Sequence, residues 1–365
     1  MANRDLYAGL MSGTSVDGVD AVLADFSQPN FRVLAHVHVP FDGALRDALL
    51  ELTTTGDDEI EKAGRLGCIL ARHYALAVSL VLREAGVSTA DVAAVGCHGQ
   101  TVRHRPEQGF TVQIGNPALL AELAGIRVVA DFRSRDIAAG GQGAPLAPAF
   151  HAVAFGDAGE SRAVVNIGGI ANVTLLPCNS QVRGYDTGPG NCLMDLWAQR
   201  HIGQPYDANG TWAAGARSLR PLLARMLSEP YFCQEPPKSS GRELFNAGWL
   251  SRFVAGSENI QAVQSTLLDL TVESIARAVE AARPPVSRLI VCGGGAFNAA
   301  LMRHLGDRLS ALIVETSAAH ELEADRVEAT AFAWLARCAI EGQAGNLPDV
   351  TGASGPRVLG AVYPA

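Results

Sequence analysis

Hydrophobic residues along the chain fall into short runs separated by polar or glycine-rich turns, and one arrangement of these runs occurs twice. The first set of runs lies at 7–11, 21–26 and 32–39, and the second set lies at 163–167, 173–176 and 181–185. Each set reads as two strands joined by a tight turn, followed by a third strand. Because the same order recurs after about 155 residues, the pattern predicts a duplicated domain.

The remaining apolar residues alternate between helical and strand spacing. In 57–85 they recur at steps of three and four residues, which predicts a long helix. Buried strands are predicted at 92–96 and 288–292, and further strands at 110–114 and 127–131, with a helix beginning near Pro117. Further helices are predicted near 191–202, 211–228, 246–254, 260–283, 297–306 and 324–341. Strands that alternate with helices indicate an α/β protein.

Glycine and proline gather in 138–145, which we interpret as the connection between two halves. The predicted division is an N-terminal lobe at 1–140, a second lobe at 141–345, and an irregular tail at 346–365 that packs back on the body. A chain of 365 residues is long enough for two domains of ordinary size.

Composition narrows the classes of partner. The net charge of −8 argues against binding to nucleic acid or to an anionic membrane. No uninterrupted apolar run is long enough to predict a membrane span, and the N-terminus does not resemble a signal peptide. The seven cysteines are scattered without a Cys-x-x-Cys pair, so we expect reduced thiols in a cytoplasmic protein.

The turn at 12–20 is the first candidate site. Backbone N–H groups around Gly13 are able to approach phosphate oxygens closely, and the hydroxyls of Thr14 and Ser15 add donors. Asp17 or Asp20 is suited to hold hydrated Mg²⁺. The same residue types also fill ordinary hairpin turns, and the Gly-x-x-x-x-Gly-Lys pattern of a P-loop is absent.

Three further candidates lie in the second half. Gly168 and Gly169 match the first turn in position. Asp186 is predicted at the end of a strand, where it suits either a general base or a cap for the next helix. The run 293–295 joins a strand to a helix and lets a ring or a phosphate lie against bare backbone, although a plain turn also explains it. The run lacks the glycine spacing of a nicotinamide-binding site.

Several polar residues at strand or helix ends complete the candidates. His98 and Gln100 lie in a turn after a buried strand and could contact a substrate or simply satisfy the backbone. Arg133 suits a carboxylate partner, although surface pairing is the default explanation. Glu328 lies early in a helix, where an acid also stabilises the helix dipole.

Taken in order, these stretches resemble the anhydro-N-acetylmuramic acid kinase family. The matching stretches are 9–15 with Asp17, Gly18 and Asp20, then 96–101, 131–133, 166–172, 186–191 and 293–295. The resemblance extends over essentially the whole chain. It implies the duplicated ribonuclease H-like fold of the actin-like ATPases, with two lobes around a nucleotide cleft. It also implies ATP-dependent phosphorylation of the sugar O6 while water opens the 1,6-anhydro bridge, a step in peptidoglycan recycling.

The resemblance also assigns roles to residues. It makes Asp186 the base that deprotonates the attacking water and Glu328 a second acidic residue at the sugar. ATP and Mg²⁺ are the implied cofactors, and of the two candidate carboxylates we expect Asp17 to be the metal ligand. The nucleotide-binding residues implied are Gly13, Thr14, Ser15, Val16, Asp17, Gly18, Val19, Asp20, Gly168, Gly169, Gly293, Gly294 and Gly295. The sugar-binding residues expected are His98, Gln100, Arg133 and Asn191.

The same resemblance leads us to expect a cytoplasmic homodimer. Other functions remain open at this point. A kinase for another anhydro sugar, such as levoglucosan, would use the same residues. An ATP-driven binding module on the same fold is a second alternative, although no peptide-binding domain follows the second lobe. A dinucleotide-dependent oxidoreductase is the least favoured.

Overall fold

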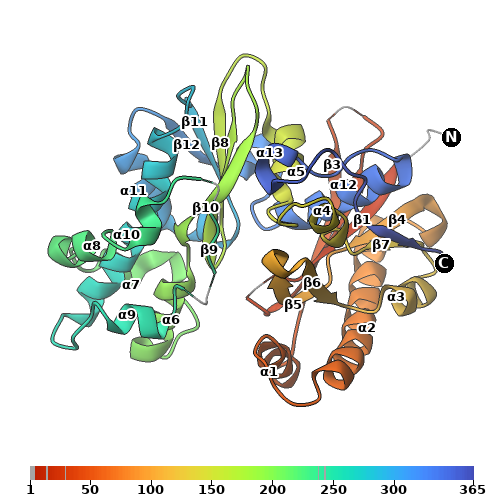
Figure 1. The fold of residues 1–365 in the computed structure, drawn as a ribbon, viewed down its shortest axis with the longest axis horizontal. Coiled ribbons are helices and arrows are strands. Elements are labelled where there is room, and N and C mark those ends of the chain that lie inside the picture. Colours follow the sequence, from red (N-terminus) through yellow and green to blue (C-terminus); the bar gives the residue numbers. More distant parts are fainter. Residues whose placement is uncertain (1–4, 14, 29, 237, 242–243) are drawn as a thin grey trace. The chain divides into compact units, whose positions relative to one another are not determined.

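The computed structural model describes residues 5–13, 15–28, 30–236, 238–241 and 244–365 (Figure 1). The chain divides into two compact units. Unit 1 comprises Met1–Phe150 and Arg326–Ala365, and unit 2 comprises His151–Asp325. Each unit is built around one mixed β-sheet with helices packed against it.

Unit 1 contains a six-stranded sheet in the order β13-β7-β4-β1-β2-β3. Its strands are β1 (Leu6–Met11), β2 (Gly18–Asp25), β3 (Arg32–Pro40), β4 (Val92–Cys97), β7 (Val128–Ala130) and β13 (Ala361–Tyr363). Strands β1, β2 and β3 pair antiparallel, whereas β4 runs parallel to both β1 and β7. A separate hairpin joins β5 (Gln100–Arg105) to β6 (Phe110–Ile114).

Helices cover both faces of this sheet. Alternate residues of β1 explain the arrangement, because Leu6, Ala8 and Leu10 belong to the core cluster shared with α2 (Glu59–Ala85), whereas Tyr7 belongs to the cluster shared with α12 (Val327–Glu341). Helix α12 approaches β1 very closely, since a Cβ on Gly9 would lie 1.9 Å from the Ala329 carbonyl oxygen. The other helices of unit 1 are α1 (Gly43–Leu52), α3 (Pro117–Ala124), α4 (Ser134–Ala138) and α13 (Pro348–Thr351), and α5 (Ala147–Phe155) leads into unit 2.

Among the described residues, α2 is the single helix long and apolar enough to cross a membrane by length and composition. Its apolar residues are already used within unit 1, because Leu70, Tyr74 and Val81 are buried in the core against the sheet. The helix is therefore accounted for as the core helix of a folded domain.

Unit 2 contains a five-stranded sheet in the order β10-β9-β8-β11-β12. Its strands are β8 (Arg162–Ile167), β9 (Ile170–Leu176), β10 (Arg183–Pro189), β11 (Arg288–Cys292) and β12 (Ile313–Thr316). Its helices are α6 (Cys192–Ile202), α7 (Thr211–Ala214), α8 (Arg220–Met226), α9 (Ala247–Ser251), α10 (Ile260–Glu280) and α11 (Ala299–Arg308). Helix α10 is buried along most of its length and packs on β9 and β10.

The two sheets confirm the duplication that the hydrophobic pattern predicts. Strands β3-β2-β1-β4-β7 of unit 1 correspond one by one to β10-β9-β8-β11-β12 of unit 2. In both sheets the first three strands are antiparallel and the last two are parallel to the central strand. This repeated order is the ribonuclease H-like arrangement, and the α/β class is confirmed.

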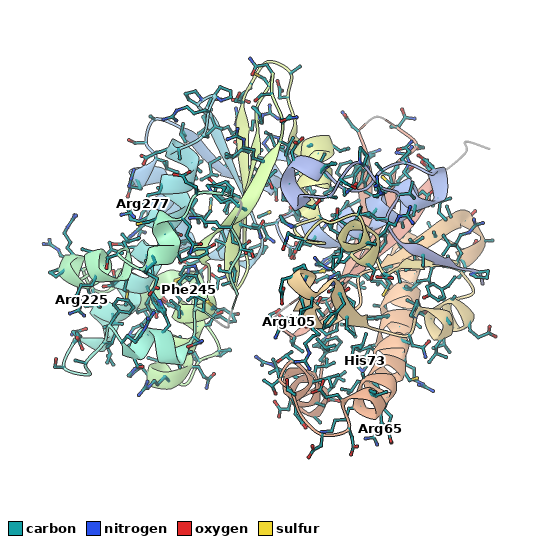
Figure 2. The ribbon with its side chains drawn as sticks, viewed as in Figure 1. Arg65, His73, Arg105, Arg225, Phe245 and Arg277 are labelled. Carbon is teal, nitrogen blue, oxygen red and sulfur yellow. The ribbon has the colours of Figure 1, made fainter. Side chains whose placement is uncertain are left out.

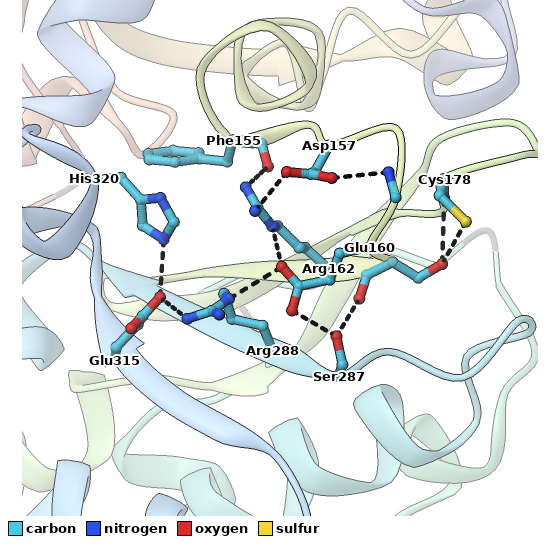
Figure 3. Close-up of polar contacts among 11 residues, drawn as sticks. Phe155, Asp157, Glu160, Arg162, Cys178, Ser287, Arg288, Glu315 and His320 are labelled. Atoms are coloured by element: carbon cyan, nitrogen blue, oxygen red, sulfur yellow. Dashed lines mark hydrogen bonds and ion pairs between the residues drawn. The ribbon is translucent and has the colours of Figure 1, made fainter.

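A network of charged side chains ties together the amino ends of the parallel strands in unit 2 (Figure 3). Glu160 accepts hydrogen bonds from Arg162 at 2.8 Å and from Arg288 at 3.2 Å, and these two arginines are the first residues of β8 and β11. Arg288 also donates to Glu315 of β12 at 2.6 Å. The network therefore crosses three neighbouring strands.

The structure differs from the predicted organisation in four places. The run 138–145, interpreted as the connection between the halves, lies within unit 1, which continues to Phe150. Helix α12 was expected in the second lobe but lies in unit 1, because its contacts are with β1, β2 and β4. The tail 346–365 was expected to be irregular, yet it contains α13 and β13, which pairs with β7. The helix expected at 211–228 is two helices, α7 and α8, with Pro221 in the first turn of the second.

Candidate active site

The turn between β1 and β2 in unit 1 is anchored from one side and open on the other. The Ser12 hydroxyl lies 2.8 Å from that of Tyr74 and donates to the Gly99 carbonyl at 3.2 Å. Gln100, which is 2% exposed, donates from Nε2 to the Gly13 carbonyl at 3.2 Å. A Cβ on Gly13 would meet no atom closer than 3.9 Å. The backbone of Gly13 is thus approachable by a ligand oxygen.

The acidic residues of this turn have different surroundings. Asp17 is exposed and accepts a hydrogen bond from the Ser15 hydroxyl at 2.7 Å. Asp20 accepts hydrogen bonds from His36 at 3.1 Å and His38 at 3.0 Å. Burial acts to raise the pKa of Asp20, but these hydrogen bonds outweigh it and keep that pKa below its usual value. Asp20 therefore serves to hold β2 against β3.

The other residues of the turn are structural in character. Val16 adopts a left-handed conformation (φ 53°) and donates its N–H to the Gly13 carbonyl at 3.2 Å. A Cβ on Gly18 would lie 2.6 Å from the Val39 carbonyl oxygen, so this glycine is required by the packing of β3. Val19 is fully buried in the core. The predicted residue Thr14 lies outside the described residues.

His98, Arg133 and Glu328 form a second group in unit 1. Arg133 donates from Nε and Nη2 to His98 Nε2, at 3.2 and 2.9 Å. Burial, and then the charge of Arg133, lower the pKa of His98 to about 3, so the imidazole is neutral and accepts these bonds. Burial lowers the pKa of Arg133 to about 10, against the opposing charge of Glu328. The His98 ring also lies 4.8 Å from that of Phe332 on α12.

In unit 2 the glycine turns meet at the carboxyl ends of β8 and β11. The backbone N–H of Asn191 donates to the Gly168 carbonyl at 2.8 Å, and that of Gly190 donates to the Gly169 carbonyl at 2.9 Å. A Cβ on Gly293 would lie 2.1 Å from Asn166 Oδ1, so the turn after β11 packs against the end of β8. The structure thus brings the three predicted segments 168–169, 190–191 and 293–295 together.

The glycines of this region are of two kinds. Gly293 (φ 77°) and Gly295 are tightly packed, since a Cβ on Gly295 would lie 2.4 Å from Ile167 Cγ2. Gly168 and Gly294 are open, because a Cβ on either would meet nothing closer than 3.7 Å. The packed glycines hold the turns together, and the open ones leave backbone that a ligand can approach.

Asp186 lies within β10 and not at its end as predicted, at a bulge between Asp186 and Gly188. Its carboxylate accepts a hydrogen bond from the Ser240 N–H at 2.9 Å. Its own N–H donates to the Lys238 carbonyl at 3.2 Å, and its carbonyl accepts from the Tyr231 hydroxyl at 2.7 Å. The Asp186 side chain is half-buried, and the carboxylate, N–H and carbonyl of this residue are each hydrogen-bonded to one of these three partners.

The residues that hold Asp186 were missed by sequence reasoning. Tyr231 packs edge-on against Phe245, a fully buried residue among the helices of unit 2 (Figure 2). Lys238 lies over the Tyr231 ring with its Nζ 4.9 Å from the centroid. The sequence around Lys238 and Ser240 is rich in proline and serine, but it gives no sign that these two residues contact β10.

The predicted site residues therefore form two groups. Unit 1 holds the turn 12–20 together with His98, Gln100, Arg133 and Glu328. Unit 2 holds Gly168, Gly169, Asp186, Asn191 and Gly293–Gly295. Asn191, which was grouped with the sugar-binding residues, lies in the glycine region of unit 2, with its Nδ2 donating to the Ile167 carbonyl at 3.2 Å.

Comparison with known proteins gives a match over nearly the whole chain. The model of the family described as anhydro-N-acetylmuramic acid kinase matches residues 5–365. A protein of that name from Nitrosomonas europaea is 52% identical over 361 residues, which cover 98% of this chain and 99% of the relative. One from Bordetella pertussis is 52% identical over 365 residues, covering 99% of this chain and 96% of the relative.

The solved structures that match this chain are more distant in sequence. Component A of the (R)-2-hydroxyglutaryl-CoA dehydratase of Acidaminococcus fermentans is 14% identical, with a TM-score of 0.48 over 90% of this chain and 96% of its own. A ROK family glucokinase from Streptomyces griseus, in complex with glucose and AMPPNP, is 15% identical, with a TM-score of 0.42 over 91% of this chain and 99% of its own.

Proposed function

The chain belongs to the anhydro-N-acetylmuramic acid kinase family, and from this premise we propose that it phosphorylates O6 of 1,6-anhydro-N-acetylmuramic acid with ATP while water opens the anhydro bridge. The family match and the relatives at 52% identity extend over almost the entire chain, so the chain is a sugar kinase, a phosphotransferase. The products are N-acetylmuramic acid 6-phosphate and ADP, which suits a role in peptidoglycan recycling.

The proposed reaction couples two bond changes. A water oxygen bonds to the anomeric carbon C1 as the C1–O6 bond breaks, and the water proton passes to the Asp186 carboxylate. The electron pair left on O6 forms the new bond to the γ-phosphorus, and the bond from that phosphorus to the bridging oxygen breaks to release ADP. One carboxylate thus suffices as the base, and the other residues position groups and neutralise charge.

The observation that carries this proposal is the placement of Asp186 in unit 2. The Asp186 carboxylate on β10 accepts a hydrogen bond from the Ser240 N–H. The two residues that follow β10, Gly190 and Asn191, donate their N–H groups to the carbonyls of the open glycine turn 168–169. The residue proposed as the base and the turn proposed to bind phosphate therefore belong to one folded unit. Such preorganisation is what a reaction without covalent catalysis requires.

Each unit is proposed to offer backbone N–H groups to the phosphates of ATP, from Gly13 in unit 1 and from Gly168 and Gly294 in unit 2. Gly13, Gly168 and Gly294 have backbone that a ligand can approach, and the N–H groups there suit phosphate oxygens. Mg²⁺ is proposed to bind with Asp17, which is exposed, whereas Asp20 is occupied by two histidines. The described residues contain no group of three or more His, Cys, Asp or Glu side chains able to hold a metal. Mg²⁺ takes one or two carboxylates together with phosphate oxygens and water, and it would neutralise charge on the phosphates.

The sugar is proposed to contact the unit 1 group. Arg133 carries a positive charge beside the neutral His98 and suits the lactyl carboxylate of the substrate. Glu328 is proposed as a second acidic residue at the sugar. A cytoplasmic homodimer is proposed from the resemblance to the family.

The test is product analysis in ¹⁸O-labelled water. We expect ADP release only with an anhydro sugar present, and a 6-phosphorylated product with ¹⁸O at C1. A product without the label would overturn the coupled hydrolysis. Equal turnover of levoglucosan, which lacks the N-acetyl and lactyl groups, would favour a broader anhydro-sugar kinase, and ADP release without sugar would favour an ATP-driven binding module.

A further inference from the structure

Asp136 is a fully buried carboxylate in unit 1 to which the proposed reaction gives no role. Its Oδ1 accepts hydrogen bonds from Asn346 Nδ2 and from the Thr351 hydroxyl, both at 2.7 Å. Its Oδ2 accepts from the Gly143 N–H at 2.8 Å. Burying a carboxylate is costly unless such donors satisfy it. Its three donors therefore tie Asp136 to two other segments of the chain.

The donors come from two segments that are far apart in the sequence. Asn346 and Thr351 belong to the C-terminal segment 346–357, and Gly143 belongs to the loop after α4. Main-chain hydrogen bonds join the same segments, from Gln142 N to the Thr351 carbonyl at 2.7 Å and from Ser354 N to the Ala139 carbonyl at 2.8 Å. The C-terminal segment thus fixes the loop at 139–143 through both its side chains and its backbone.

Gly143 connects this loop to Arg133, which is proposed to contact the sugar. The Gly143 carbonyl accepts a hydrogen bond from Arg133 Nη1 at 2.9 Å, while the Nε and Nη2 of Arg133 donate to His98. Gly143 has φ 67°, and a Cβ there would lie 2.8 Å from Ile137 Cγ1, so glycine is required at this position of the loop. A guanidinium held at three nitrogens has one defined orientation.

We propose that the C-terminal segment 346–357 acts through Asp136 as a clamp that orients Arg133 toward the sugar, which makes Asp136, Asn346 and Thr351 positioning residues. The inference rests on the proposed contact of Arg133 with the sugar. It goes further by assigning a function in substrate binding to a segment that the sequence indicates only as a tail. Loss of the clamp should weaken sugar binding and leave nucleotide binding and the chemical step unaffected.

Thr351→Val tests the clamp with a change that keeps the side-chain shape. We expect KM for the anhydro sugar to rise about fivefold, with kcat and KM for ATP within about twofold of wild type, since a lost binding contact raises KM alone. Thr351→Ser restores the hydroxyl and should bring KM back toward the wild-type value. Thr54→Val is the matched control, because it removes a threonine hydrogen bond to the Glu51 carbonyl elsewhere in unit 1.

A double-mutant cycle separates a clamp from a general loss of stability. Arg133→Ala should raise the sugar KM by about tenfold or more, and adding Thr351→Val to it should then change KM little, because both act through one guanidinium. Additive effects, or a Thr351→Val variant with an unchanged sugar KM, would overturn the clamp.

If Asp136→Asn folds, it should raise the KM for the sugar more than Thr351→Val does. If Asp136→Asn does not fold, Thr351→Val still tests the clamp. The wild-type protein tests the proposed function independently of the clamp. If it makes no ¹⁸O-labelled product, the proposed reaction is wrong, whatever the variants show. An Arg133→Ala variant with an unchanged sugar KM would overturn the contact with the sugar, and the clamp with it.

Discussion

The two ends of the sheet in unit 2 differ in composition, with paired charged residues at one end and glycine turns at the other. At the amino ends of β8 and β11, Glu160, Arg162 and Arg288 pair their charges across the strands (Figure 3). At the carboxyl ends of the same strands, Gly168 and Gly294 are open, since the nearest described atom that a Cβ on either would meet lies at 3.7 Å. At the amino ends the charged side chains are paired with one another, whereas at the carboxyl ends open backbone is left for a ligand. Substitutions at the first end should therefore affect stability and those at the second should affect activity.

The sharpest test of this contrast is a pair of Asp→Asn substitutions. Asp186→Asn removes the proposed base, and we expect kcat to fall by about a thousandfold because a positioned base contributes on this scale. Nucleotide binding, measured by calorimetry, should stay within about twofold of wild type, since the amide keeps the shape of the side chain.

The matched control lies at the opposite end of the sheet. Asp157 accepts hydrogen bonds from Arg162 and from the Gly159 N–H, both at 2.8 Å. Asp157→Asn should leave kcat within about twofold of wild type, because an exposed ion pair contributes little. An Asp186→Asn variant with near wild-type turnover would remove the distinction between the two ends.

Two adjacent glycines sharpen the comparison within the carboxyl end. Gly295→Ala places a methyl group 2.4 Å from Ile167 Cγ2, and we expect it to destabilise the fold by about 1–3 kcal/mol in denaturant unfolding. Gly294→Ala meets only Asn191 Nδ2 at 3.7 Å, so its stability should be close to wild type. Its affinity for ADP should fall by about tenfold if a nucleotide lies against this backbone. Unchanged ADP affinity in Gly294→Ala would argue against nucleotide binding at this turn.

Tyr231→Phe addresses how the carboxyl end is held. The hydroxyl of Tyr231 donates to the Asp186 carbonyl at 2.7 Å, and its loss removes one hydrogen bond worth about 1 kcal/mol. If this bond orients the base, kcat should fall by about threefold to tenfold with KM for ATP unchanged. A lower unfolding midpoint with an unaltered kcat would make Tyr231 a purely structural residue.

Much of this arrangement is predictable from the sequence because the relevant signals are local. The turns at 12–20, 168–169 and 293–295 combine apolar strands with glycines, and the repeated strand order follows from their spacing. The family resemblance then supplied the chemistry. Asp20 shows the limit of such reasoning, because its two histidine partners lie on the next strand and nothing in the local motif indicates that they occupy the carboxylate.

The residues that sequence reasoning missed act through contacts between distant segments. Tyr231 and Ser240 reach Asp186 from 45 and 54 positions along the chain, and Thr351 reaches Asp136 from 215. Helix α12 has the apolar spacing of any buried helix, so its sequence does not reveal which of two similar sheets it covers. Such placements depend on packing between complementary surfaces. The hydrophobic spacing within one segment predicts a helix or a strand, but it does not indicate which other segment that element packs against.

The smallest effect is expected at the amino end, where Glu160→Gln should cost about 1 kcal/mol of unfolding free energy at neutral pH and leave kcat unchanged. Hydrogen bonds from Arg162, then from Ser287 and Arg288, lower the pKa of Glu160 to about 2 in the folded protein, below its ordinary value of 4.5. A depressed folded-state pKa stabilises the fold above pH 4.5, and this stabilisation is lost as the pH falls toward 2. Denaturant unfolding of wild type and Glu160→Gln across this range should therefore converge in acid. A difference that persists unchanged at pH 2 would show that the charge of Glu160 does not stabilise the strands it joins.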